Sequence, residues 1–154
     1  MYLVSLALFL FILPLVSVIG EAMWFGDTTG GLMPLVGKWY TFWAAGVRLF
    51  AAGVTQTFRP KFTAESIFHI KDPAAQGLVR EIGFGNLSIG ALALASLIMP
   101  SWTVPAALAG GLYYGLAGLG HTLTKERSTK EQQALVTDIF AFLVLAAFVI
   151  NALR

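Results

Sequence analysis

Apolar residues form five long runs along this chain, and the polar residues gather between the runs. Each run has close to the roughly 20 residues that a helix needs to cross the hydrocarbon core of a bilayer. The predicted helices are residues 2–19, 39–58, 82–99, 104–121 and 135–153. The pattern therefore predicts an all-α, polytopic membrane helix bundle, a single domain over residues 1–154 with five transmembrane helices.

The first run carries no charge and is interrupted only by Pro14. A membrane helix tolerates proline, and we expect a kink there. The run lacks the basic region that begins a signal peptide, so we interpret it as a retained helix. Between the helices, residues 20–38 predict an interfacial loop, and residues 59–80 predict an interfacial amphipathic helix that breaks at Asp72-Pro73.

Basic residues are distributed unequally between the two sides of the predicted bundle. The side with the second and fourth connections carries Arg59, Lys61, Lys71, Arg80, Lys125, Arg127 and Lys130. The opposite side carries Lys38 and Arg154. Because cytoplasmic loops are enriched in Lys and Arg, this bias predicts a cytoplasmic N-terminus and an external C-terminus.

Composition agrees with the lipid bilayer as the solvent and removes several classes of function. Hydrophobic residues make up 57% of the chain and charged residues 12%, about half the share in a soluble domain. The net charge of +2, without a basic patch interleaved with aromatic residues, argues against a nucleic-acid partner. The chain has no cysteine, which excludes disulfides, thiolate catalysis and thiolate-bound clusters. We predict no cofactor.

Arg48 lies in the middle of the second apolar run. A guanidinium at that depth costs at least about 2.5 to 3.5 kcal/mol on insertion scales, so such a residue is by default a functional-site hypothesis. Helical spacing places it on a stripe of small and polar residues with Ala44, Ala52 and Thr55. We therefore expect Arg48 to face the bundle and not the lipid.

Four further polar residues are expected near Arg48. They are Glu81, Asn86, His121 and Asp138. In the predicted topology the third and fifth helices begin, and the fourth ends, on the cytoplasmic side, which brings these side chains to a similar depth. We predict that the five residues form a buried ligand-binding centre, and we predict no metal ligands and no catalytic residues.

Each of these residues also has a structural interpretation that the sequence leaves open. Arg48 and one carboxylate would form an ion pair that holds two helices together, as intramembrane charges commonly do. Glu81 suits the start of a helix and His121 the end of one, because of the helix dipole. Asp138 suits the membrane interface.

Small residues recur in the fourth predicted helix at Gly111, Gly115 and Gly118. Such a seam allows a neighbouring backbone to approach closely in a membrane. We interpret these glycines as packing residues.

Several runs resemble a family of small bacterial integral-membrane proteins of unknown function. They are GKWYTFWAAGVRLFAAGVTQTFRPKFTAESIF, LVREIGFGN, GLYYGLAGLGH and TDIF. That family is similar in layout to the DoxX-like four-helix membrane proteins. The resemblance covers about residues 36–148 and implies a four-helix bundle after the first helix, in a bacterial inner membrane. It implies no established activity. Some DoxX-like proteins are associated with membrane redox or thiol-stress systems, and this chain has no cysteine for thiol chemistry.

Three functions stay open from the sequence. The first is binding or transport of an unknown small ligand at the polar centre, including proton-coupled transport, by a homo-oligomer. The second is an accessory or structural subunit of a larger membrane complex. The third is a membrane enzyme acting on a lipophilic substrate, which is disfavoured because the chain has no zinc-protease motif, nucleophile elbow, phosphate loop or nucleotide fingerprint.

Overall fold

The computed structural model describes residues 2–26, 30–123 and 129–154, and within them every regular element is helical. The first helical rod runs through α1 (Tyr2–Ala7), the π-helical turn η1 (Leu8–Ile12) and α2 (Leu13–Phe25). The second runs through α3 (Leu32–Tyr40), the π-helical segment η2 (Thr41–Arg48) and α4 (Leu49–Phe58). The predicted all-α class is confirmed.

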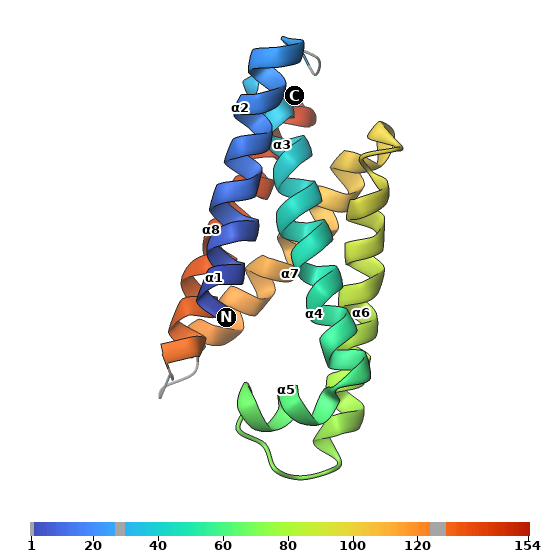
Figure 1. Cartoon of the computed structure of the whole chain (residues 1–154), viewed down its shortest axis with the longest axis vertical. Helices are drawn as coiled ribbons and strands as arrows, with labels where there is room; N and C mark the ends of the chain where they lie inside the picture. The colour runs from blue at the N-terminus through green and yellow to red at the C-terminus, as the bar shows by residue number, and fades with distance from the viewer. Residues whose placement is uncertain (1, 27–29, 124–128) are drawn as a thin grey trace.

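The remaining helices complete the bundle shown in Figure 1. They are the short α5 (Pro60–Ser66), then α6 (Ala75–Ala95), the 3₁₀ turn η3 (Pro100–Trp102), α7 (Thr103–Leu123) and α8 (Thr129–Ala152). Three stretches are long and apolar enough to cross a membrane: Leu3–Phe25, Ala75–Ala95 and Glu131–Ala152. Their outward faces carry large apolar side chains such as Val16 and Leu143. These features indicate a membrane protein.

The helices are longer than the apolar runs from which they were predicted. The first rod continues to Phe25, and the second already begins at Leu32, so helix replaces most of the interfacial loop predicted for residues 20–38. The sequence boundaries had excluded the charged residues Glu21 and Lys38. These two side chains bind each other, which lets both helices continue through them. Likewise α6 begins seven residues before the predicted boundary. The charged side chains of Arg80 and Glu81 in this extension are exposed, whereas Ala75 and Val79 are buried.

Both π-helical segments have local consequences. The turn η1 directly precedes Pro14, which cannot donate to the carbonyl of Leu10 and whose ring crowds that carbonyl, so the helix widens there. The kink expected at Pro14 stays a prediction. The second segment, η2, ends at Arg48. π-helical turns inside α-helices are frequent at functional sites.

Glycines set the close approaches between helices. A Cβ added at Gly118 would lie 2.7 Å from Ile139 Cδ1, and one at Gly115 would lie 2.8 Å from the Phe142 ring, so α7 packs directly on α8. The predicted packing role of the α7 seam is thus confirmed. A Cβ at Gly83 would lie 2.8 Å from Thr57 Oγ1, which joins α6 to α4 in the same way. Figure 1 shows these two pairs, α4 with α6 and α7 with α8.

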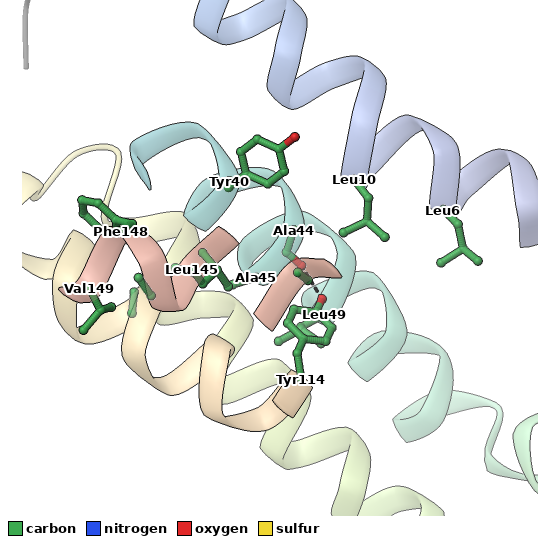
Figure 2. Packing of buried hydrophobic residues seen from close by; sticks show 14 residues of the cluster. Leu6, Leu10, Tyr40, Ala44, Ala45, Leu49, Tyr114, Leu145, Phe148 and Val149 are labelled. Atoms are coloured by element: carbon green, nitrogen blue, oxygen red, sulfur yellow. Dashed lines mark hydrogen bonds between the residues drawn. The ribbon is translucent and has the colours of Figure 1, made fainter. Parts of the chain in front are cut away.

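Small residues of η2 lie at the centre of the bundle, where the α4–α6 helix pair meets the α7–α8 helix pair. A Cβ at Gly110 of α7 would lie 2.6 Å from the Cβ of Ala45. Around this contact lies the core drawn in Figure 2, which joins the first rod to the rest. Its largest side chains include Leu10, Tyr40, Leu49, Tyr114, Leu145 and Phe148. The core therefore surrounds the turn that ends at Arg48.

Candidate functional site

Arg48 and Asp138 form an ion pair between η2 and α8. Arg48 Nη2 lies 2.8 Å from Asp138 Oδ1, and the two side chains are only 15% and 9% exposed. Arg48 lies ten residues before the end of its helical rod, about 15 Å along the axis at 1.5 Å per residue. Asp138 lies inside the candidate span Glu131–Ala152. The expectation that Arg48 faces the bundle is confirmed by this pairing.

The second oxygen of the same carboxylate faces a histidine. His121 Nε2, near the end of α7, lies 4.0 Å from Asp138 Oδ2, and the imidazole is partly exposed. Antiparallel packing of α7 on α8 brings the end of one helix beside the first turns of the next. One carboxylate is thus shared between a permanent cation and a titratable imidazole.

Tyr114 and Thr137 hold the guanidinium in place. The Arg48 Cζ atom lies 4.9 Å from the centroid of the Tyr114 ring, a cation–π distance. The Tyr114 hydroxyl donates to the carbonyl of Ala44, inside the π-helical segment. Thr137 Oγ1 donates to the backbone of its own helix and lies 3.5 Å from Arg48 Nη2. The site is therefore fixed by residues from three helices.

Tyr114 and Thr137 were not among the predicted site residues. A signal for both was present. Tyr114 precedes His121 by seven positions, which places both on one face of a helix, and Thr137 adjoins Asp138. A search by helical phase around His121 would have found the tyrosine.

Glu81 lies apart from this centre, whereas Asn86 is connected to it through Tyr113, which interacts with Asn86, Asp138 and Arg48. Glu81 is exposed on the outer face of α6. Asn86 is almost fully buried, and its Nδ2 donates to Gln56 Oε1 at 2.7 Å, which links α6 to α4. Five positions separate the two residues, about 140° around a helix, so they cannot share a face. The structure brings Arg48, His121 and Asp138 together and leaves Glu81 outside.

A second ion pair, absent from the predicted site, lies where α2 meets α3. Lys38 Nζ donates to Glu21 Oε1 at 2.9 Å and to Oε2 at 2.8 Å. Trp39 Nε1 donates to Glu21 Oε2 at 2.8 Å. One turn further along, Trp43 Nε1 donates to Ser17 Oγ at 2.9 Å. This group was not among the predicted site residues because Glu21 and Lys38 were expected to lie in a loop.

A partly open cavity of about 940 Å³ lies beside this second ion pair. Its walls come from the later turns of α2 and α8, from α3, from the residues that follow α6, from η3 and from the first turn of α7. Within the described part of the chain, no group of three or more His, Asp or Glu residues is arranged to hold a metal ion.

Comparison with known proteins gives one match. A family model described as "Family of unknown function (DUF6790)" matches residues 4–154. No curated protein and no solved structure shows significant similarity to the chain. A likeness to DoxX-like proteins is not among these findings.

Proposed function

The chain belongs to the DUF6790 family of unknown function, and from this premise we propose that it binds a small ligand at the Arg48–Asp138–His121 centre and moves a proton with it. The observation that carries the proposal is that one buried carboxylate faces two basic side chains, an arginine and a histidine. Oδ1 of Asp138 pairs with Arg48, and Oδ2 faces His121.

The proposal places five helices across a bacterial inner membrane, with the N-terminus in the cytoplasm. Three stretches satisfy the length and apolarity of a span, and the rod from 32 to 58 and α7 pack between them. The basic residues from Arg59 to Arg80 lie around α5 at one end, which supports that end as cytoplasmic. Lys125 and Arg127 lie outside the described residues. The four later helices would then have the layout that resembles the DoxX-like proteins.

The side-chain chemistry of Arg48, Asp138 and His121 gives each residue a different role in proton transfer. Arginine stays protonated in proteins, so Arg48 keeps a positive charge beside Asp138 and cannot relay a proton. Histidine changes charge near physiological pH. His121 also has the most exposed side chain of the three. A proton would therefore enter at His121 and pass to the Asp138 oxygen that faces it. A ligand that draws the guanidinium away from the carboxylate would increase this transfer, but the transfer does not require the ligand.

Proton movement tests this function directly. Purified protein is reconstituted in liposomes that contain a pH-sensitive dye, and a potassium diffusion potential drives proton entry. We expect proton flux that Asp138→Asn and His121→Gln abolish, while Glu81→Gln, on the exposed face of α6, leaves it unchanged. Equal flux in all four proteins and in empty liposomes would reject proton transfer at this centre.

Ligand binding is tested separately by native mass spectrometry of protein extracted gently from its own membranes. A discrete retained molecule that is lost in Arg48→Ala and kept in Glu81→Gln supports the ligand site. Retention that is the same in both variants would place the ligand elsewhere on the protein.

A second candidate function, an accessory subunit, is favoured by the outer face of α6. A Cβ added at Gly77 or Gly85 meets nothing within 4 Å, and Glu81 is exposed between them. Small residues on a membrane helix admit a close partner helix. Affinity purification in mild detergent tests it: a stoichiometric partner that is lost in Gly85→Leu supports this reading, and a chain that purifies without a partner contradicts it.

A further inference from the structure

We infer that the cavity between α2, α3 and α7 binds a neutral lipid whose head offers carbonyl oxygens and whose tail is hydrocarbon. The inference is independent of the proton-transfer function, because the cavity lies at the end of the bundle opposite α5, away from Asp138 in the first turns of α8. Its volume of about 940 Å³ falls within the range of small-molecule sites.

The polar wall of the cavity is a donor surface. The Lys38 side chain is 30% exposed and lines the cavity, whereas its partner Glu21 is 8% exposed. Two of the three N–H donors of the ammonium serve the two Glu21 oxygens, and no further hydrogen bond joins Lys38 to a described residue. Ser17 also lines the cavity, and its oxygen accepts from Trp43, so its hydroxyl proton is oriented by that contact. The wall therefore suits acceptor oxygens.

The carboxylate of Glu21 is already occupied on the protein side. Both of its oxygens accept from Lys38, and one accepts from Trp39 as well. A ligand that donates hydrogen bonds would have to compete with these contacts. A ligand that meets this group with acceptor oxygens would bind without breaking any.

The rest of the lining is largely apolar. It includes Phe25, Pro34, Leu97, Val104 and Phe148. A hydrocarbon chain that enters from the bilayer through the open side of the cavity would keep apolar surroundings along these residues. The site thus combines a polar group with an apolar lining, which matches an amphiphile.

Charge balance selects a neutral head. The Glu21 carboxylate lies 2.8 Å from the Lys38 ammonium, so the pair carries no net charge. A phosphate that approached Lys38 would also be repelled by the neighbouring Glu21 carboxylate, and this repulsion would offset part of the attraction to the ammonium. An ester carbonyl gains the hydrogen bond without that repulsion.

Two lipids with the same acyl chains distinguish a site for a neutral head from a site for an anionic head. Purified protein in detergent is titrated with 1,2-dioctanoylglycerol or with dioctanoyl phosphatidylglycerol, and bound lipid is counted by native mass spectrometry. We expect dioctanoylglycerol to bind at least as tightly as the phosphatidylglycerol. Tenfold tighter binding of phosphatidylglycerol would overturn the inference in favour of an anionic site.

Two variants localise the binding. Gly20 lines the cavity, and a Cβ there would meet only the Trp24 ring, at 3.8 Å, so Gly20→Leu places a bulky side chain at the cavity wall without a backbone clash at its Cβ. We expect this variant to lose dioctanoylglycerol binding by tenfold or more. Gly85→Leu, on the open face of α6, is the matched control and should bind normally.

The double variant Glu21→Gln, Lys38→Met removes the ion pair without leaving an unpaired charge. We expect about tenfold weaker binding, the equivalent of one hydrogen bond. This double variant tests whether the lipid binds at the ion pair even if Gly20→Leu fails to fold. Thermal unfolding shows whether each variant is folded. Unchanged dioctanoylglycerol binding in the folded double variant would overturn the inference.

Discussion

Asp138 Oδ1 and Arg48 Nη2 lie 2.8 Å apart although the two residues are 90 positions apart in the chain. Nothing in the local sequence of either residue requires this contact. It arises because the Gly110–Ala45 approach brings η2 onto α7, while the α7 glycines bring α8 onto the same helix. The ion pair thus depends on small residues elsewhere in the bundle.

We predict that Asp138→Leu alone destabilises the protein by about 3 to 5 kcal/mol, because it leaves the buried Arg48 without its carboxylate. The double variant Arg48→Met, Asp138→Leu should recover most of that loss, since well-packed apolar residues often replace a buried pair at little cost. Thermal unfolding in detergent measures both.

The same double variant separates structure from function. If the ion pair serves only to hold helices together, the double variant should keep wild-type proton flux. The proposed relay requires instead that flux is lost in a protein that is stably folded.

Tyr114→Phe should cost about 1 to 3 kcal/mol, because it leaves the buried Ala44 carbonyl without the hydroxyl that donates to it. The ring that lies over Arg48 stays in place, so the ion pair should persist. Tyr40→Phe is the control, since its hydroxyl makes no hydrogen bond to a described residue. Equal unfolding midpoints for the two variants would show that the Tyr114 hydroxyl contributes nothing.

The sequence predicts some residues of this site and not others, and the reason differs from residue to residue. Arg48, His121 and Asp138 were predictable because a charge within an apolar run must find a partner, and antiparallel topology fixes the depth of each helix end. Glu81 was at the right depth but on the wrong face. Depth follows from position along a helix, whereas facing depends on which side of α6 meets α4.

The two stripes of α6 show why the sequence could not predict which face of this helix is buried. Asn86 and Gly90 lie on one stripe, Glu81 and Gly85 on the neighbouring one, and both stripes are small and polar. The structure buries the first and exposes the second. The decision comes from packing, because the α4 backbone at Phe50 fits only against Gly90, where a Cβ would lie 2.6 Å from the Phe50 nitrogen.

Two neighbouring glycines of α6 should therefore respond in opposite ways. Gly83→Ala should destabilise the protein, because the new Cβ would lie 2.9 Å from the Thr57 backbone nitrogen. Gly85→Ala meets nothing within 4 Å and should stabilise it by up to about 1 kcal/mol through helix propensity. Thermal unfolding of both proteins makes the comparison, and a shift in the same direction would contradict this account of α4–α6 packing.

Thr41→Val should raise stability by about 1 kcal/mol. The Thr41 side chain is fully buried at the start of η2, and its hydroxyl has no hydrogen-bond partner among the described residues. Removing an unsatisfied buried hydroxyl recovers part of its desolvation cost. A lower unfolding midpoint for Thr41→Val would instead show that the hydroxyl binds a group outside those residues, or a water.

The proposed orientation can be measured directly because the chain has no cysteine that would compete for a thiol reagent. Lys61 lies in α5, where its side chain is 69% exposed, and Arg154 is exposed at the other end of the bundle. Each is replaced by cysteine in a separate variant, Lys61→Cys and Arg154→Cys. A membrane-impermeant maleimide should label Arg154→Cys in intact cells and Lys61→Cys only after the membrane is opened, since basic loops stay in the cytoplasm. The reverse pattern would invert the topology and place His121 and its proton entry on the outer side.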